Sequence, residues 1–318
     1  MNQTTSKIIA VLGATGAQGG GLIHAILAHP ESGFSARAIT RNPESEKAKE
    51  LAALGVDVVA ADLDDEQSLV AAFDGAYGAF CITNFWEHFS PDKEIEQAAK
   101  LATAAKTAGV SHVIWSTLED VRDFVPLDDD RMPTIMERYK VPHFDAKGES
   151  NHFFSDAGVP TTFLNTTFYW DNMIYFGMGP KPGTDGTLAI TFPLGDATLA
   201  GIAAGDIGGC AFGIFEAGGE FIGKTVGIAG GHLSGQEMAA SLSKALGQEV
   251  RYNAVSPDAY RSFGFPAAEE LGNMFQFYAE FSDQYCAARN LDATRKLNPD
   301  LHSFDRWLEE NASKIPLD

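Results

Sequence analysis

Residues 8–28 read IIAVLGATGAQGGGLIHAILA, and this stretch decides the fold. Residues 8–13 form an apolar run typical of a buried strand, and residues 18–28 have the apolar spacing of a helix. The glycines between them follow a G-x-x-G-x-x-G pattern. A tight turn, a backbone without Cβ atoms and a helix N-terminus with free N–H groups together hold a pyrophosphate. We therefore predict a dinucleotide site, rather than a turn without a ligand, formed by Gly13, Thr15, Gly16, Ala17, Gln18 and Gly19.

The first half of the chain repeats this alternation of strand and helix. Near-continuous apolar strands separated by helices indicate a parallel sheet that is covered on both faces. Right-handed connections make such a sheet doubly wound, so the predicted fold class is an α/β Rossmann fold. The expected strands are 8–13, 35–40, 56–63, 78–83 and 112–117, and the expected helices are 18–28, 43–54, 65–73 and 93–108.

The second half differs in character and predicts a smaller α/β domain for a substrate or a partner. We assign residues 1–160 to the Rossmann domain and expect segments at about 161–176 and 200–216 to return to it. Residues 177–318 mainly form the smaller domain. Its expected elements are a loop at 177–187, strands at 224–230 and 249–255, a helix from the capping box at Ser234 to Gly247, and a short helix at 257–263.

The composition argues against several classes of function. A formal net charge of −20 disfavours direct binding of nucleic acid and of anionic membranes. The three cysteines, Cys81, Cys210 and Cys286, are widely spaced, which argues against disulfides and fits a reducing compartment. The sequence has no HExxH or G-x-S-x-G motif and no paired metal-ligand cluster, so we predict no metal site. We expect a cytoplasmic protein, or a nuclear one if its role is regulatory.

The end of the second strand favours NADP(H) over NAD(H). NAD sites usually place an Asp or Glu there to bind the ribose 2′-hydroxyl, but residues 38–42 read AITRN and contain no acid. Arg41 is positioned to pair with a 2′-phosphate, unless it is only a solvated arginine at a strand end. The residues at the end of the third strand, Asp62 and Leu63, are expected to flank the adenine. Those after the fourth strand, Thr83, Asn84 and Phe85, are expected near the pyrophosphate and the nicotinamide ribose.

The reaction end of the predicted cleft lies outside the carboxyl ends of the fifth strand and of a sixth strand, which we expect within residues 161–173. The candidates there are Ser116, Thr117 and residues 165–168, of which Phe168 is the one expected beside the cofactor. Between these strands, His143 and Lys147 lie four residues apart and so share one face of a predicted helix.

His143 stands where short-chain dehydrogenases carry the tyrosine of a Tyr-x-x-x-Lys acid/base pair. Tyr139 lies one turn earlier, but Pro142 separates it from the helix. An imidazole can donate a proton near neutral pH, so His143 is either an acid/base group or a partly exposed first-turn histidine. Lys147 is either part of that chemistry or a lysine that only binds the ribose.

These motifs resemble the NmrA-like family of atypical short-chain dehydrogenases, and the likeness runs nearly from end to end. The late segments matter because a generic Rossmann protein would not share them. The resemblance implies NADP(H) as the cofactor, with Arg41 at the 2′-phosphate and Lys147 at the nicotinamide ribose. The matching segments are 13–19, Arg41, 83–86, 143–149, 168–172, 205–208, 264–266, 273–278 and 304–308.

The resemblance leaves two kinds of function open. The chain closely resembles the NADPH-sensing members of the family, which carry the same segment as residues 143–149. Because of this likeness and because the tyrosine is missing, we favour a regulator that responds to NADPH/NADP⁺ and binds a protein partner, with a homodimer also possible. The alternative is an NADPH-dependent reductase, or a non-redox enzyme that retains the cofactor, acting on a bulky apolar carbonyl, imine or quinone. For that alternative, the aromatic segments 168–170 and 273–278 would line an apolar cleft rather than pack in a core.

Overall fold

A seven-stranded sheet forms the centre of the fold, which the computed structural model describes for residues 6–317. Its strand order is β11-β6-β5-β4-β1-β2-β3, and every neighbouring pair is parallel. This doubly wound order confirms the predicted fold class. The order reverses between β1 and β4, where open α/β sheets bind ligands. The strands are β1 (Lys7–Val11), β2 (Phe34–Thr40), β3 (Asp57–Ala60), β4 (Gly78–Cys81), β5 (His112–Thr117), β6 (Thr161–Asn165) and β11 (Thr225–Gly227).

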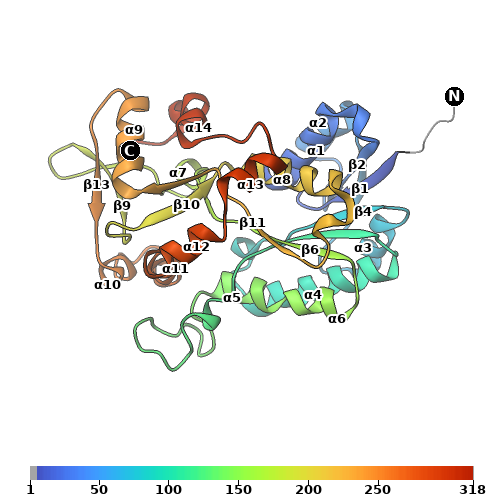
Figure 1. The fold of residues 1–318 in the computed structure, drawn as a ribbon, viewed down its shortest axis with the longest axis horizontal. Coiled ribbons are helices and arrows are strands. Elements are labelled where there is room, and N and C mark those ends of the chain that lie inside the picture. The colour runs from blue at the N-terminus through green and yellow to red at the C-terminus, as the bar shows by residue number, and fades with distance from the viewer. Residues whose placement is uncertain (1–5, 318) are drawn as a thin grey trace.

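Helices cover both faces of this sheet (Figure 1). One face carries α1 (Ala17–Ala28), α2 (Glu46–Ala53) and α8 (Ala204–Glu216). The other carries α3 (Glu66–Phe73), α4 (Pro91–Thr107) and α6 (Asn151–Asp156).

Helices α1 and α8 pack against each other unusually closely. A Cβ atom at Gly208 of α8 would fall on the backbone of Leu22 in α1, and one at Gly21 would fall on Gly205. Helix α8 therefore forms in spite of its glycines, because these glycines let two helix backbones touch.

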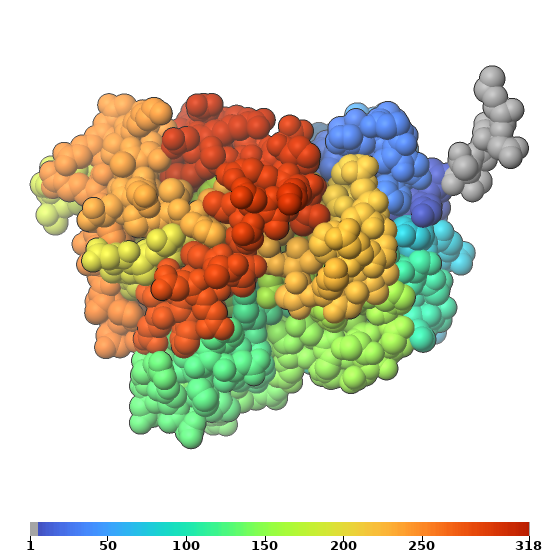
Figure 2. Space-filling view, in the orientation of Figure 1, coloured from blue at the N-terminus to red at the C-terminus, as the bar shows by residue number. Residues whose placement is uncertain are grey.

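The rest of the chain builds a second unit beside the large sheet, around two three-stranded sheets, β12-β10-β7 and β13-β9-β8. Its apolar core contains Trp170, Phe275 and Trp307. Helix α13 (Leu291–Leu297) of this unit lies against α8 (Figure 2), where a Cβ atom at Gly213 of α8 would meet the backbone of Leu297. The elements are β7 (Phe168–Tyr169), α7 (Asn172–Tyr175), β8 (Lys181–Pro182), β9 (Leu188–Phe192), β10 (Thr198–Ile202), β12 (Gly231–Ser234), α9 (Gly235–Leu246), β13 (Val250–Ala254), α10 (Pro257–Arg261), α11 (Ala268–Glu280), α12 (Ser282–Ala287), α13 (Leu291–Leu297) and α14 (Phe304–Asn311).

Several boundaries differ from the predictions for local reasons. The helix expected from residue 43 begins at Glu46, because the Ser45 side chain caps it by accepting from the N–H of Ala48. The segment 177–187 is not wholly a loop, since it contains β8, which pairs with the following strand β9. Of the strand expected at 224–230, only Thr225–Gly227 is extended, and it joins the edge of the large sheet. Among residues 6–317, no helix is long and apolar enough to cross a membrane.

Candidate functional site

A cavity of about 1120 Å³ lies at the carboxyl ends of the large sheet and reaches α11 of the second unit. Ser116 and Thr117, which end β5, are part of its wall. Asn165, at the end of β6, is not. The other residues predicted for the site all line this one cavity: Gly13, Thr15, Gly16, Ala17, Gln18, Gly19, Arg41, Asp62, Leu63, Thr83, Asn84, Phe85, His143, Lys147 and Phe168.

The glycine turn after β1 has the geometry of an anion cradle. Gly13 adopts φ +61°, a conformation that favours glycine, and Gly16 is the N-cap of α1 without a side-chain cap. The first-turn N–H groups of α1 therefore have no side-chain partner, and they open into the cavity with the positive end of the helix dipole. A Cβ atom at Gly19 would lie 2.5 Å from the carbonyl oxygen of Gly13, so the third glycine lets helix and turn meet. The turn fits the pyrophosphate of a dinucleotide.

Arg41 follows β2 and forms an ion pair with Glu87, which ends the short 3₁₀ helix η2 (Phe85–Glu87). Its side chain is 64% exposed and that of Glu87 is 45% exposed. Arg41 is thus neither unpaired nor buried. A carboxylate does lie beside it, although the end of β2 contains no acid, and no local pattern around Arg41 indicates this contact.

Lys147 is held in the cavity wall by a buried carboxylate. Its Nζ lies 2.8 Å from Glu94 Oε1 and donates to Thr83 Oγ1 at 2.8 Å. The Thr83 hydroxyl in turn donates to Glu94 Oε1 at 2.6 Å. The side chain of Glu94 is fully buried and that of Lys147 is 12% exposed. Lys147 therefore neutralises Glu94 at the same time as it faces the cavity.

His143 and Glu270 form a buried pair in which the two side chains are only 8% and 7% exposed. His143 Nδ1 lies 2.6 Å from Glu270 Oε1, and the backbone N–H of His143 donates to the same oxygen at 2.8 Å. Because an ionised carboxylate only accepts hydrogen bonds, Nδ1 carries the proton. Nε2 is then the ring nitrogen that remains to contact a molecule in the cavity. His143 lies in the first turn of α5, as predicted, but it is buried and not partly exposed.

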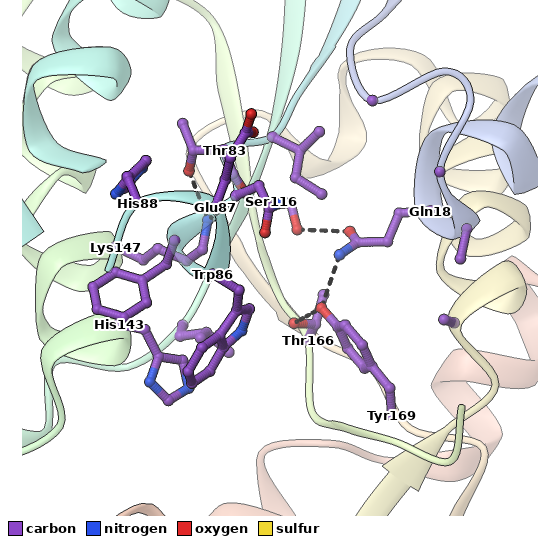
Figure 3. Close-up of a pocket in the computed structure, with 18 of the residues that line it drawn as sticks. Gln18, Thr83, Trp86, Glu87, His88, Ser116, His143, Lys147, Thr166 and Tyr169 are labelled. Carbon is purple, nitrogen blue, oxygen red and sulfur yellow. Dashed lines mark hydrogen bonds between the residues drawn. The ribbon is translucent and has the colours of Figure 1, made fainter. Parts of the chain in front are cut away.

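Aromatic rings enclose the imidazole of His143 (Figure 3). The ring of Trp86 lies 4.8 Å from it between centroids, and the rings of Phe85 and Phe144 lie 5.8 and 4.8 Å away. These rings limit the access of water to the imidazole.

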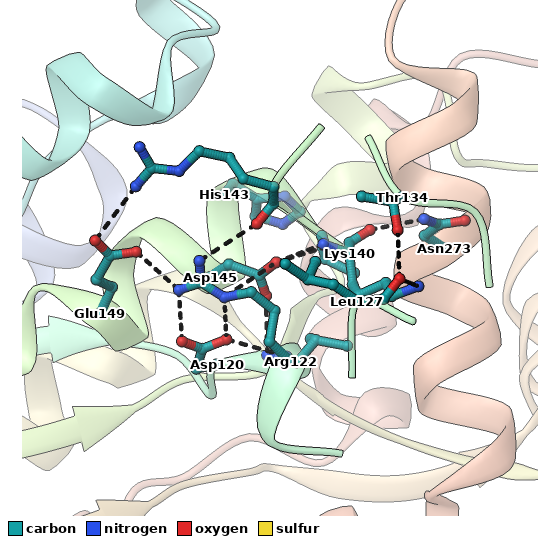
Figure 4. A network of polar contacts seen from close by, with 12 residues as sticks. Asp120, Arg122, Leu127, Thr134, Lys140, His143, Asp145, Glu149 and Asn273 are labelled. Atoms are coloured by element: carbon teal, nitrogen blue, oxygen red, sulfur yellow. Dashed lines mark hydrogen bonds and ion pairs between the residues drawn. The ribbon is translucent and has the colours of Figure 1, made fainter. Parts of the chain in front are cut away.

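Helix α5 (Pro142–Glu149) carries His143 and Lys147, and Asp145 fixes its first turn (Figure 4). The buried Asp145 carboxylate accepts from the backbone N–H groups of Lys140, Val141 and Val121 at 2.7–3.1 Å. Burial raises the pKa of Asp145 to about 7. The preceding loop is in this way bound to the helix.

Tyr139 lies in the loop before α5, as we predicted from the position of Pro142. It bridges to Ile135, outside the helix, and its hydroxyl is buried without a hydrogen-bond partner among the described residues. It is not part of the cavity wall, so it does not replace the missing tyrosine.

Opposite His143, a row of polar side chains connects the glycine turn to β7 (Figure 3). Ser116 Oγ donates to Gln18 Oε1 at 2.9 Å, and Gln18 Nε2 donates to the Tyr169 hydroxyl at 2.8 Å. The Tyr169 and Thr166 hydroxyls are 3.0 Å apart. Burial raises the pKa of Tyr169 to about 12, so this phenol stays protonated at neutral pH.

The remaining wall of the cavity is apolar and comes mostly from the second unit. Three of the aromatic residues that we proposed for it, Trp170, Phe275 and Phe277, lie in the core instead, because Trp170 packs on Phe304 and Phe275 on Phe192. The other three, Phe168, Tyr169 and Tyr278, line the cavity as proposed. Phe168 borders the cavity, but its ring is buried against the same core. The apolar wall consists of Phe176, Met178, Phe265, Leu271, Met274 and Tyr278.

Three carboxylates in or beside the site were missed by sequence reasoning: Glu87, Glu94 and Glu270. Each pairs with a predicted site residue but lies far from it along the chain. Glu94 and Glu270 are almost fully buried. The sequence signal that could have identified them is an acid on the apolar face of a helix, where charged residues are rare unless they are paired.

Comparison with known proteins places the chain in a family. A family model described as the NmrA-like family matches residues 5–308. An NmrA-like family domain-containing oxidoreductase of a Cladobotryum species is 29% identical, with 90% of this chain and 88% of the relative covered. An NAD(P)H azoreductase of Xenophilus azovorans is also 29% identical, with 88% of this chain and 89% of that enzyme covered.

The solved structures agree with this placement. NmrA, a negative transcriptional regulator, in complex with NADP has a TM-score of 0.77 and 25% identity, with 98% of this chain and 96% of NmrA covered. Its complex with NAD gives the same TM-score and identity. The match of the family model over nearly the whole chain, on a fold that superimposes on NmrA itself, shows that this protein belongs to the NmrA-like family.

Proposed function

We propose that this protein is an NADP(H)-dependent oxidoreductase that reduces a bulky apolar acceptor such as a quinone, carbonyl or imine. The observation that carries the proposal is the His143–Glu270 pair, because Glu270 orients His143 from behind and His143 lines the cavity between the nucleotide cradle and the apolar wall. An oriented imidazole beside an apolar compartment suits proton transfer to an apolar acceptor bound there. For this reason we favour the reductase, which was our second choice from the sequence.

The cofactor half of the cavity suits NADP(H). The glycine turn would hold the pyrophosphate, Arg41 the 2′-phosphate, and Lys147 the nicotinamide ribose. The structure of NmrA with NADP and the relatives named oxidoreductases support this assignment. When bound, NADPH supplies a hydride.

The residues of this chain supply the proton that the same reduction consumes. His143 Nε2 can hold that proton, because Glu270 orients the ring through Nδ1 and stabilises the imidazolium. The aromatic rings around the imidazole keep water out. Lys147 is committed to Glu94 and Thr83, so we assign it to binding rather than to proton transfer.

The test is loss of NADPH absorbance with quinones, ketones, imines and an azo dye as acceptors. We expect turnover with at least one class, and His143→Gln should lower kcat about 100-fold, within the usual range for a general acid. His152→Gln is the matched control, because His152 is exposed on the next helix. No turnover by protein that binds NADPH tightly, or full activity of His143→Gln, would contradict the proposal.

A redox-sensing regulator is the second candidate, and one observation favours it. Helix η2 contacts Arg41 through Glu87 at one end of the cavity and His143 through Trp86 at the other. Occupancy of the nucleotide site could therefore be transmitted along this short segment. A sensor must respond differently to NADPH and NADP⁺. Identical protease sensitivity and oligomeric state with both forms would exclude this role.

A further inference from the structure

The positive side chains of the cavity wall are all neutralised by acids. The lysines and arginines among the described residues that line the cavity are Arg41, Lys93 and Lys147. Arg41 pairs with Glu87, Lys93 with Asp64 at 2.6 Å, and Lys147 with Glu94 at 2.8 Å. A dinucleotide phosphate that enters this cavity must therefore compete with a carboxylate for any of these cations.

The three pairs differ in how easily they can be separated. Glu94 is fully buried, and separating it from Lys147 would leave a charge in the interior. Asp64 is also fixed by Gln97, whose Nε2 donates to it at 3.0 Å. The Arg41–Glu87 pair is largely exposed, and exposed pairs contribute little to stability. Arg41 is therefore the cation that can exchange its partner at the lowest cost.

We propose that Glu87 is a specificity-determining residue that sets the choice between NADP(H) and NAD(H). It supplies, from η2, the carboxylate that the end of β2 lacks. A 2′-phosphate must displace Glu87 from Arg41 and is repelled by it. A ribose 2′-hydroxyl can instead donate to a carboxylate, which is how an acid at the end of the second strand favours NAD in other Rossmann proteins. Glu87 thus weakens NADP(H) binding and assists NAD(H) binding. This inference rests on the nucleotide site of the proposed function, but not on its chemistry.

The experiment measures affinity by calorimetry for NADP⁺ and NAD⁺, and for adenosine 2′,5′-bisphosphate and 5′-AMP, which lack nicotinamide. Glu87→Gln should strengthen NADP⁺ binding about three-fold or more, as expected for loss of an exposed competing pair. It should leave NAD⁺ binding equal or weaker, so the ratio of the two affinities rises. The affinity for adenosine 2′,5′-bisphosphate relative to that for 5′-AMP should rise in the same way. Arg41→Ala should weaken NADP⁺ at least ten-fold and spare NAD⁺.

Glu46→Gln is the control, because it removes the same charge from an exposed position near Arg41 in sequence. It should leave the ratio unchanged, and thermal unfolding should show that both variants fold. If Glu87→Gln binds tightly but its affinity ratio is unchanged, the proposed role of Glu87 is overturned while the proposed function still stands. A wild-type protein that binds neither dinucleotide would overturn the proposed function and this inference together.

Discussion

Glu270 Oε1 lies 2.6 Å from His143 Nδ1, although 127 residues separate the two in sequence. Glu270 is in the first turn of α11, in the second unit, and His143 is in the first turn of α5, beside the large sheet. The reaction end of the cavity is therefore completed only where the two parts of the chain meet. The second unit contributes the carboxylate that pairs with His143 as well as an apolar wall.

Glu270→Gln should lower kcat about 10- to 100-fold with little change in the affinity for NADPH, because an amide orients the imidazole but does not stabilise its charged form. The pH profile of kcat should also shift. These quantities are measured by steady-state kinetics across pH and by NADPH titration.

Glu269→Gln is the control for this variant, since Glu269 precedes Glu270 in α11 but is exposed. If both variants keep wild-type kcat and the same pH profile, Glu270 has no function in proton transfer.

Lys147→Met should destabilise the fold by about 3 kcal/mol or more, because it leaves the fully buried Glu94 without its cation. Denaturant unfolding measures this cost. The double variant with Glu94→Gln should recover part of the loss, and Lys106→Met, an exposed lysine of α4, should change stability little. A cost below about 1 kcal/mol for Lys147→Met would mean that Glu94 does not depend on this ion pair.

Gly19→Ala should weaken NADP⁺ binding at least ten-fold, because a Cβ atom there would lie 2.5 Å from the carbonyl oxygens of Gly13 and Leu12 and would push the turn out of shape. Gly20→Ala is a matched control one residue later, where the nearest atom, the Ala14 carbonyl oxygen, lies at an ordinary 3.4 Å. It should keep the affinity and stabilise α1 by about 0.5–1 kcal/mol. Equal affinities for the two variants would show that the cradle tolerates movement of its turn.

Stability should fall as the pH is lowered from 6.5 towards 4, because of His112. This histidine is fully buried at the start of β5, and burial lowers its pKa from 6.5 to about 4. Its Nδ1 has no hydrogen-bond partner among the described residues. The folded-state pKa lies below the unfolded one, so in this window the unfolded chain binds more protons and acid favours unfolding.

The contribution of His112 amounts to about 3 kcal/mol between pH 7 and pH 4. It is measured as the difference in urea unfolding between wild type and His112→Gln at several pH values, with the exposed His24→Gln as control. The pH slope of His112→Gln should be the shallower one. Parallel slopes for the two variants would assign the acid sensitivity to other groups.

The glycine turn, the strand–helix alternation and the helix that places His143 and Lys147 on one face could all be predicted from the sequence. Each of these features depends on residues within a few positions of one another, where backbone geometry leaves few choices. Helices α2 and α4 begin after the capping residues Ser45 and Ser90. Because caps are also local, the observed helix starts differ from the predicted ones by only a few residues.

The charge partners of the site could not be predicted in this way. Nothing local links Glu270 to His143, Glu94 to Lys147 or Glu87 to Arg41, since each pair forms between different elements. The missing acid at the end of β2 was correctly noted, yet the acid beside Arg41 comes from η2.

The sequence by itself thus determined the Rossmann fold and the position of its nucleotide turn, because periodicity and turn chemistry are local properties of the chain. Only the tertiary structure decided which cations are neutralised, which imidazole is oriented and which aromatic residues line the cavity instead of the core. These depend on the order of strands in the sheet and on the docking of α11, which bring together residues more than 100 positions apart, such as His143 and Glu270.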